Sequence, residues 1–461
     1  MYSVDSALAK VLQQRRQKLG ALIESPVLLW SGRAPSKNFL ANQYSFRASS
    51  HFLYFAGLPI QGAAICLHQG QVTLLMEDVP DSDALWHGVS PTRQQIAEQI
   101  GAIAHYPLSH FPDYRAAATI PVQDLWTRSQ QSQVLGRSWQ DATDLQGIDR
   151  DLAEALVQLR LVQDESAIAA IQEAATVTVR AHLAGIHQTH SAHTEAQVRA
   201  AMESVLLAEN MTTAYTSIVT VQGEVLHNLY SHRKLQPGDL LLADVGAEHP
   251  LGWAADVTRT WPVSGQWSAT QRAIYDVVLA AHDACIAAIA PGVEYAAVHL
   301  TAARVIAAGL VDLGILKGDP TTLVERGVHA LFFPHGVGHL LGLDVHDMED
   351  LGDLAGYAPG RTRSDRCGMQ YLRLHRPLQV GMVVTIEPGF YQVPAILGAA
   401  RQQAALEDCV NWERLATFED VRGIRIEDDV WVTPKGPQVL TAALPTQADE
   451  IVQLMHSSPV G

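Results

Sequence analysis

Residues 332–347 read FFPHGVGHLLGLDVHD, and this stretch carries the most informative pattern in the chain. Three histidines, His335, His339 and His346, fall within twelve residues of an apolar, glycine-rich sequence. His-x3-His spacing can form a metal-binding pair on a helix, but two glycines between the first two histidines disfavour a regular helix. We therefore predict a glycine-rich strand or turn that brings imidazole groups to a cavity. A single histidine here would more often be a core residue, whereas three of them indicate a site when acids accompany them.

Four acidic residues stand inside apolar, strand-like stretches of the same half of the chain. They are Asp244, Asp256, Glu387 and Glu427. An ionised carboxylate is costly to bury unless a cation or a set of hydrogen-bond donors compensates it. Nearby cations are too few to pair all four acids. The pattern therefore favours bound metal over strand-end carboxylates that bond only to backbone N–H groups or to an arginine.

This ligand set is rich in oxygen and contains one or two imidazoles. Such sites suit harder cations such as Mn²⁺ better than thiolate-type zinc sites do. Four acids also exceed the needs of one ion, so we predict two divalent ions bridged by carboxylates, most simply Mn²⁺, with Co²⁺ or Zn²⁺ as alternatives. Two ions about 3.5–4 Å apart can activate a water molecule and hold the oxyanion that forms when it attacks.

The first third of the chain has the pattern of a separate α/β domain. Short apolar runs at 26–30, 63–67 and 72–76 are typical of buried strands, and 91–100 is typical of a helix. A long helical segment follows, with one apolar face, and we place the domain boundary in it. The predicted N-terminal domain is 1–155.

The remaining residues, 156–461, form the second predicted domain. Its apolar strands carry the acids, and a helix opens at Ser268 and Gln271, which have capping-box spacing. Residues 381–389 repeat the design of 237–246, namely a turn, an apolar strand, an acid, and glycine two residues later. The repetition indicates a weak internal pseudo-repeat.

The composition excludes several classes of protein. The 461 residues carry 32 basic and 48 acidic side chains, a formal net charge of −16, which argues against nucleic acid and anionic membranes as partners. No apolar run reaches the roughly 18 residues of a membrane-spanning helix, and the N-terminus lacks the apolar core of a signal peptide. Four scattered cysteines form no disulfide framework. We therefore expect a cytoplasmic protein.

The order of the acids and histidines, with their flanking sequences, resembles the pita-bread metallopeptidases, which include methionine aminopeptidase, aminopeptidase P and prolidase. The matching words are ADVG, ADVTRTW, FFPHGVGHLLGLDVHD, TIEPGFY and GIRIEDDV. Residues 42–57 are also similar to the N-terminal domain of aminopeptidase P and prolidase, which methionine aminopeptidases lack. The resemblance covers nearly the whole chain and implies an N-terminal α/β domain, active in dimerisation and in walling off the site, before a pita-bread catalytic domain.

The resemblance implies a role for each ligand. Asp244 would bind one metal ion, and His339 and Glu387 would bind the other. Asp256 and Glu427 would bridge both ions, with a hydroxide between them as the nucleophile. These assignments imply a dinuclear-metal hydrolase.

The resemblance also implies roles around the metal site. Glu387 would carry a proton during the reaction, and His227 and His346 would contact the substrate and the developing oxyanion. His335 would line the pocket, and Arg425 would support Glu427 from behind.

Two features favour prolidase, an Xaa-Pro dipeptidase, within this family. The segment between Glu387 and Glu427 is long, as in prolidases, and includes Asn411-Trp412 near its end. Arg373 resembles the prolidase arginine that grips the free C-terminal carboxylate of a dipeptide, a contact that selects against longer peptides.

The predicted function is therefore Xaa-Pro dipeptide hydrolysis by a homodimer. Aminopeptidase P, which cuts longer Xaa-Pro-Yaa peptides, is the alternative, and a non-enzymatic pita-bread binding module is a remote one. Similarity to prolidase-related organophosphorus acid anhydrolases adds slow phosphotriester hydrolysis as an expected side activity.

Overall fold

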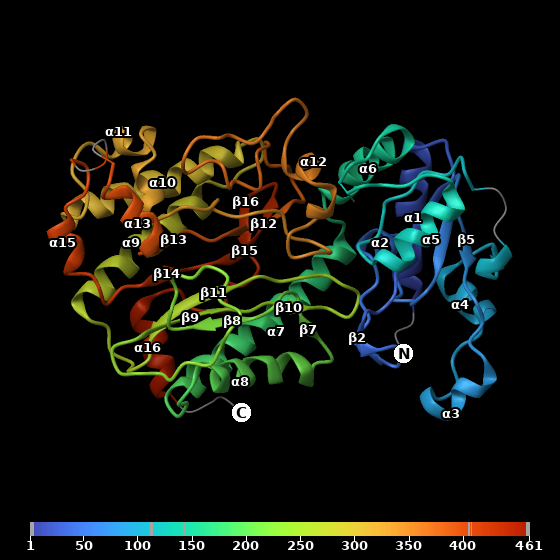
Figure 1. The fold of residues 1–461 in the computed structure, drawn as a ribbon, viewed down its shortest axis with the longest axis horizontal. Coiled ribbons are helices and arrows are strands. Elements are labelled where there is room, and N and C mark those ends of the chain that lie inside the picture. Colours follow the sequence, from blue (N-terminus) through green and yellow to red (C-terminus); the bar gives the residue numbers. More distant parts are fainter. Residues whose placement is uncertain (1–3, 111–113, 142, 404–405, 407, 458–461) are drawn as a thin grey trace. The chain divides into compact units, whose positions relative to one another are not determined.

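The computed structural model describes residues 4–110, 114–141, 143–403, 406 and 408–457. The chain divides into two compact units, and Figure 1 shows the order of their helices and strands. The first unit contains residues 1–161 and also 348–354, and the second contains 162–347 and 355–461. The sequence pattern does not predict that residues 348–354, so far along the chain, belong with the N-terminal unit.

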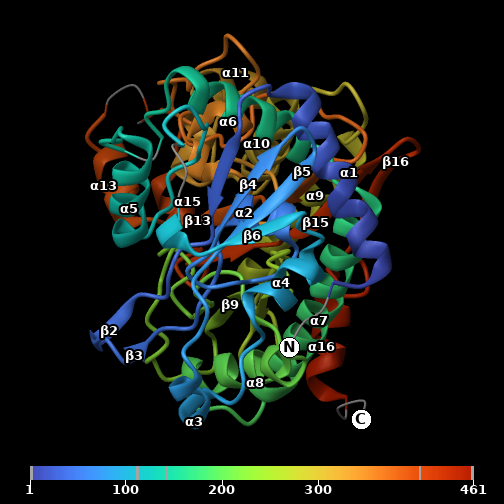
Figure 2. The same ribbon diagram turned by 90° about the vertical axis from the view of Figure 1, so that its right-hand side faces the viewer.

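The first unit is built on a four-stranded sheet in the order β1-β4-β5-β6, which Figure 2 shows from the side of this unit. Neighbouring strands are antiparallel except β5 and β6, which are parallel. The turn between β4 and β5 has positive φ at both Gln69 (50°) and Gly70 (77°), as in a type I′ turn, whose twist suits a hairpin. The strands of the unit are β1 (Val27–Trp30), β2 (Ser36–Phe39), β3 (Asn42–Gln43), β4 (Ala64–His68), β5 (Gln71–Leu75) and β6 (Ala104–Tyr106).

Several helices of the first unit begin at side-chain caps that the local sequence supplies. Asp5 caps α1, Asp124 caps α5, and Thr92 forms a capping box with Gln95 at the start of α4. Beneath them, Leu28, Trp30 and further apolar residues form a buried core against the sheet. The helices are α1 (Ser6–Leu22), α2 (Ser50–Ala56), α3 (Ala84–His87), α4 (Arg93–Ile100), α5 (Leu125–Leu135) and α6 (Gly147–Arg160).

A buried polar network ties residues 348–354 to the rest of the first unit. His51 Nε2 lies 3.0 Å from Asp350 Oδ2, and Arg160 Nη1 lies 3.0 Å from His51 Nδ1. Arg160 is almost completely buried, and its guanidinium carbon lies 6.0 Å from the ring centre of Tyr54. Because Nδ1 must accept from the guanidinium, Nε2 carries the proton and donates to the carboxylate.

The described strands of the second unit form four small antiparallel groups. The strand orders are β8-β9-β11, β12-β15-β16 and β13-β14, and β7 pairs with β10. The strands are β7 (Thr212–Thr213), β8 (Ile218–Thr220), β9 (Leu240–Asp244), β10 (Ala247–Glu248), β11 (Thr258–Pro262), β12 (Val383–Ile386), β13 (Gly389–Tyr391), β14 (Gly423–Arg425), β15 (Asp428–Thr433) and β16 (Gly436–Val439).

Helices surround these strands, and the capping box predicted at Ser268 and Gln271 is formed at the start of α9. The long helical pattern after the domain boundary is α7, which begins at Glu165 and ends at Thr189. The helices are α7 (Glu165–Thr189), α8 (Glu195–Ala208), α9 (Ala269–Ala288), α10 (Tyr295–Asp312), α11 (Pro320–Glu325), α13 (Pro394–Ala400), α15 (Trp412–Ala416) and α16 (Ala448–His456). Helix α12 (Asp353–Gly356) begins in the first unit and ends in the second.

Helix α10 is the one described helix whose length and composition would allow it to cross a membrane. Its residues Ala303 and Ala307 pack in a buried cluster with Val324 of α11. Core helices often have such a composition, so this helix by itself is weak evidence for a membrane.

Candidate metal centre

Strand pairing gathers the four predicted acids, all of which lie at strand ends and not in strand interiors. Asp244 is the last residue of β9, and Asp256 stands two residues before β11. Because β9 and β11 are antiparallel with Thr258 opposite Asp244, these two acids lie at the same end of their sheet. Glu387 directly follows β12, and Glu427 directly precedes β15.

The two strand systems are joined by backbone hydrogen bonds beside the acids. The N–H of Glu427 donates to the carbonyl of Thr258 (3.0 Å), and the Thr258 hydroxyl donates to Glu427 Oε2 (2.7 Å). The N–H of Asp256 donates to the carboxylate of Asp429 (3.1 Å). These bonds fix the position of Glu427 relative to Asp256.

Asp256, His339 and Glu427 form a buried group whose ligand atoms all lie within 4.8 Å of one another. His339 Nε2 is 3.4 Å from Asp256 Oδ2 and 3.7 Å from Glu387 Oε1. Ligands that bind one ion at about 2.1 Å stand roughly 3–3.5 Å apart, so the spacing suits a cation between them.

The histidine is oriented as a metal ligand should be. His339 Nδ1 lies 3.0 Å from the carbonyl of Leu340, so Nδ1 carries the proton and donates to that oxygen. The lone pair of Nε2 is then directed at the carboxylates, an arrangement that is typical of ligating histidines.

Asp244 is not one of the three residues in this group, and its carboxylate has other hydrogen-bond partners. The hydroxyl of Tyr215 donates to its Oδ1 (2.6 Å), and Arg425 Nη2 donates to its Oδ2 (2.5 Å). Arg425 reaches Glu427 through Thr258, since its Nε donates to the Thr258 hydroxyl (3.0 Å). Thus the carboxylate that Arg425 touches is that of Asp244, whereas its support of Glu427 passes through a hydroxyl.

The electrostatics of the acids favour a bound cation. Burial, and then the charge of Asp244, raise the pKa of Asp256 to about 7. Burial likewise raises the pKa of Glu387 to about 7, although His339 and Arg425 oppose the shift. The pKa of Glu427 is raised well above its usual range by burial and by Asp256. Three buried carboxylates and the half-buried Glu387, with one guanidinium and the imidazole of His339, form a donor set that divalent ions fit.

His346, His227 and Arg373, which the sequence assigned to the substrate site, differ in their relation to the metal-ligand group. The ring centre of His346 lies 4.3 Å from that of His339. Burial lowers the pKa of His227, and the positive charges of Arg425, Arg373 and His346 lower it as well, so His227 shares their electrostatic environment. Arg373 is half-buried.

His335 is held in one tautomer by two hydrogen bonds. Its Nδ1 lies 2.7 Å from the carbonyl of Gly336 and its Nε2 lies 2.9 Å from the hydroxyl of Tyr391. Nδ1 therefore donates, and Nε2 accepts from the tyrosine. Burial lowers the pKa of His335 to about 3, which keeps the ring neutral. Its Nδ1 is 3.7 Å from Glu387 Oε2.

Sequence reasoning missed several residues that hold the ligands. Tyr215 carries no signal that sets it apart from other buried tyrosines, whereas Thr258 stands in the quoted ADVTRTW sequence. Tyr391, which links His335 to Arg425 (3.1 Å), stands in the quoted TIEPGFY word, and Asp429 is the third of three consecutive acids after Ile426. Such a run of acids in an apolar sequence was the available signal.

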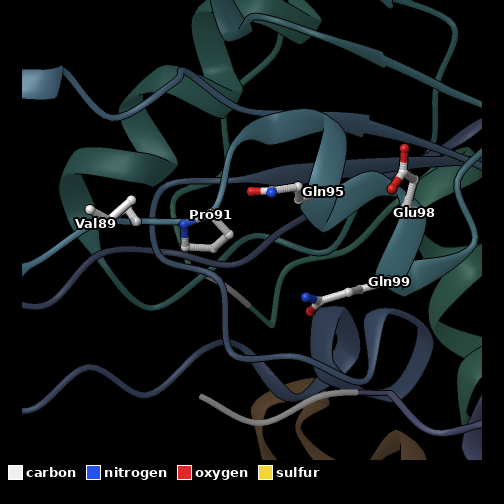
Figure 3. A pocket seen from close by; sticks show the side chains of 6 residues that line it. Val89, Pro91, Gln95, Glu98 and Gln99 are labelled. Carbon is white, nitrogen blue, oxygen red and sulfur yellow. The ribbon is translucent and has the colours of Figure 1, made fainter.

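Figure 3 shows a surface hollow that is remote in sequence from these residues. It is lined by residues of the first unit, among them Val89, Pro91, Gln95 and Glu98. None of the predicted site residues lines it, and its lining lacks convergent buried ligands. The hollow therefore contributes nothing to the metal centre.

Metal binding is expected to strengthen as pH rises from about 6 to 8. Asp256 and Glu387 each hold a proton below about pH 7, and each proton must leave before the carboxylate can bind a cation. Each released proton gives about a tenfold increase in affinity per pH unit below the pKa. Isothermal titration of the metal-free protein with MnCl₂ across this range measures the effect.

The same shifts set the sign of a stability effect. A carboxyl whose pKa rises from about 4 unfolded to about 7 folded makes the metal-free fold less stable as pH rises through that interval. Added Mn²⁺ should therefore raise the melting temperature more at pH 8 than at pH 5.5. A metal-induced increase that shrinks with pH contradicts this electrostatic account.

Replacing Arg259 with methionine should lower the free energy of unfolding by about 3–5 kcal/mol. Arg259 Nη2 donates to both oxygens of Asp428 (2.8 and 3.1 Å), and both side chains are fully buried. Its Nη1 also donates to the carbonyl of Glu427 (2.6 Å). Loss of the guanidinium leaves the Asp428 carboxylate buried beside the ligand strand without its main counter-charge. Urea denaturation measures the loss.

Arg272 offers the matched control for this variant. It pairs with Asp276 and Asp449 on the surface, where its side chain is 38% exposed. Water screens such pairs, so Arg272→Met should cost no more than about 1 kcal/mol. Similar losses from the two substitutions would show that the Arg259 pair has no special weight.

The fold and the buried ligand group together define a metallopeptidase with a two-domain pita-bread architecture. The model of metallopeptidase family M24 matches residues 169–434, and the model of the aminopeptidase P N-terminal domain matches residues 12–123. The chain belongs to metallopeptidase family M24. These matches support the predicted metallopeptidase and do not support the remote prediction of a non-enzymatic module.

Individual relatives span both units. A protein of Podospora anserina named probable Xaa-Pro aminopeptidase is 31% identical over 90% of this chain and 88% of its own length. The human Xaa-Pro dipeptidase is 28% identical over 97% of this chain and 92% of its own.

Solved structures of similar fold are named as aminopeptidase P. The structure of aminopeptidase P from E. coli with the inhibitor Pro-Leu has a TM-score of 0.78 and 25% identity, and it covers 97% of this chain and 98% of its own. The aminopeptidase PepP of Pseudomonas aeruginosa has a TM-score of 0.77 and 26% identity over the same shares.

Proposed function

We propose that this protein is a metal-dependent Xaa-Pro aminopeptidase, which releases the N-terminal residue from peptides with proline in second position. The observation that carries the proposal is that relatives and solved structures of this name match the chain across both units. The activity favoured by the sequence, Xaa-Pro dipeptide hydrolysis, is the second candidate. It is supported by the match to the human dipeptidase and by Arg373.

In this proposal Asp244, Asp256, His339, Glu387 and Glu427 hold two divalent ions, with Mn²⁺ as the first candidate. Bound divalent metal lowers the pKa of water and polarises a peptide carbonyl. The chosen metal is testable by elemental analysis of protein purified without chelators. A protein that binds less than one equivalent of any divalent ion would contradict the assignment.

The side chains around these ligands would bind the peptide and move protons. Glu387, as a carboxylate beside the nucleophile, is suited to take a proton from the nucleophile and return it to the leaving proline nitrogen. His346 and His227 are suited to donate hydrogen bonds to the developing oxyanion. Neutral His335 would fill the pocket wall beside Glu387.

A comparison of Gly-Pro with Gly-Pro-Gly tests the proposal against the second candidate. Cleavage of the tripeptide after glycine supports the aminopeptidase, whereas cleavage confined to the dipeptide supports the dipeptidase. Hydrolysis of neither peptide by protein loaded with Mn²⁺ sinks both.

Arg373→Ala then tests how the peptide's end is recognised. If Arg373 holds a free carboxylate next to proline, the variant should raise KM for Gly-Pro far more than KM for Gly-Pro amide. An aminopeptidase also binds peptides such as Gly-Pro-Gly, in which proline carries no free carboxylate. For such an enzyme, Arg373→Ala should change KM by similar factors for Gly-Pro and for Gly-Pro amide.

Three other predictions have tests of their own. A paraoxon assay tests the organophosphate side activity, and sedimentation velocity tests the predicted homodimer. Fractionation of cells tests the cytoplasmic location.

A further inference from the structure

A buried carboxylate outside the ligand set holds both ends of the segment that carries His227. Glu195 is the first residue of α8, and it is completely buried. Its Oε1 accepts from the N–H of Val221 (2.8 Å), and its Oε2 accepts from the N–H of Arg233 (3.0 Å). The N–H of Glu195 itself donates to the carbonyl of Arg233 (3.1 Å). The side chain of Glu195 therefore binds the backbone at both ends of residues 221–233.

A second connection runs from this carboxylate to the neighbour of His227. The hydroxyl of Thr220 donates to Glu195 Oε1 (3.1 Å) and accepts from the Nδ2 amide of Asn228 (3.0 Å). The same hydroxyl accepts from the N–H of Gln222 (3.0 Å). Thr220 is completely buried and Asn228 nearly so. The side chain next to His227 is thus linked to Glu195 through one hydroxyl group.

The far side of the segment rests on the strand that carries Arg425. A Cβ atom on Gly223 would lie 2.8 Å from the carbonyl oxygen of Gly423, the first residue of β14, so the two backbones touch. Glu224 forms an ion pair with Arg422 beside this contact. The segment is therefore held between α8 and β14, and small movements of its ends would move His227.

We propose that Glu195 is a positioning residue for catalysis, which sets the place of His227 in the substrate site through its grip on residues 221–233 and through Thr220. The inference rests on the proposed function, because it assigns His227 to the bound peptide. Glu195 touches neither a ligand nor the substrate in this proposal. It acts through hydrogen bonds whose geometry demands an acceptor at both carboxylate oxygens.

Glu195→Gln tests the need for two acceptors. The amide has nearly the same shape but offers one acceptor and one donor, so one backbone N–H must face an NH₂ group. We expect kcat/KM for Gly-Pro-Gly to fall about 10- to 100-fold, since misplacement by about 1 Å has effects of this size. Bound metal should remain at the wild-type level, because the ligands are untouched.

Thr220 supplies a matched pair of variants. Thr220→Val keeps the shape and removes the hydroxyl, and it should lower kcat/KM about tenfold, whereas Thr220→Ser keeps the hydroxyl and should restore most of the activity. Gln197→Ala is the control for helix stability, because Gln197 caps the same end of α8 by accepting from the N–H groups of Thr194 and His193, which lie outside residues 221–233. It should lower the melting temperature with kcat/KM unchanged.

A double-mutant cycle with His227→Ala decides between positioning and a general loss of structure. If Glu195 acts through His227, Glu195→Gln should change kcat/KM less than twofold once His227 is alanine. Additive effects of the two substitutions would overturn the proposal, as would a Glu195→Gln variant with wild-type kcat/KM.

Hydrogen exchange separates failure of this inference from failure of the proposed function. In Glu195→Gln the amides of residues 221–233 should exchange at least tenfold faster than in the wild type, with the metal-binding strands unchanged. If the wild type cleaves no Xaa-Pro peptide, the proposed function fails. The hydrogen-exchange rates alone then show whether Glu195 holds residues 221–233 in place. Unchanged exchange in this segment overturns the inference whatever the activity.

Discussion

Asp256→Asn is expected to remove bound metal and to lower kcat/KM for an Xaa-Pro peptide by more than about 1,000-fold. Asp256 lies in the buried group with His339 and Glu427, and its Oδ2 faces His339 Nε2 at 3.4 Å. An amide at this position withdraws one negative charge from the site and binds divalent ions much more weakly than a carboxylate. Elemental analysis and peptide hydrolysis, done on the same preparation, measure both losses.

The stability of the metal-free variant distinguishes ligand loss from unfolding. Burial and the charge of Asp244 hold the pKa of Asp256 at about 7, so its ionised form weakens the metal-free fold above that pH. The neutral amide removes this penalty, and the melting temperature of metal-free Asp256→Asn at pH 8 should equal or exceed that of the metal-free wild type. A variant that retains metal and activity would refute the ligand role, and a lower melting temperature would point to a folding defect.

Glu387→Gln is expected to lower kcat about 100- to 10,000-fold with a smaller change in KM. The reason is that an amide cannot take up and release the proton that the Glu387 carboxylate would carry. Glu387 Oε1 also faces His339 Nε2 at 3.7 Å, so some loss of metal affinity is expected too. Assays at saturating Mn²⁺, with metal content measured in parallel, separate the two contributions.

Two further comparisons test the result expected for Glu387→Gln. His335→Asn removes the ring beside Glu387 but replaces no predicted ligand, and it should act on KM more than on kcat. A Glu387→Gln variant that keeps more than a tenth of the wild-type kcat at saturating metal would show that the proton is carried by another group. The proposed role of Glu387 would then have to be abandoned even if the residue binds metal.

Local sequence predicted much of the second unit because the relevant signals are short in range. The apolar run before Asp244 became β9, the run before Glu387 became β12, and the capping box at Ser268 opened α9. Turn residues and hydrophobic runs encode such elements within a few positions. Strand bounds were less accurate, since Asp256 lies outside β11 although the sequence suggested a strand through it.

Neighbouring acids show where local reasoning stopped. Glu427, Asp428 and Asp429 are adjacent, yet each meets a different partner: the metal-ligand group, Arg259, and the backbone of Asp256. Sequence singled out Glu427 as an acid in an apolar stretch, and the resemblance to known metallopeptidases then gave it a ligand role. It could not say which distant group each of the other two acids meets, because those partners lie about 170 residues away along the chain.

By itself, the sequence determined the family of this protein and the candidate ligands, because the residue types of a metal site and their order along the chain can be read directly from the amino-acid sequence. It also determined which strands and turns carry those residues, because hydrophobic periodicity acts locally. Only the tertiary structure decided that Arg425 pairs with Asp244, that residues 348–354 join the first unit, and that Glu195 grips the segment of His227. Each of these depends on long-range packing, in which a buried charge takes whichever donors the completed fold brings to it.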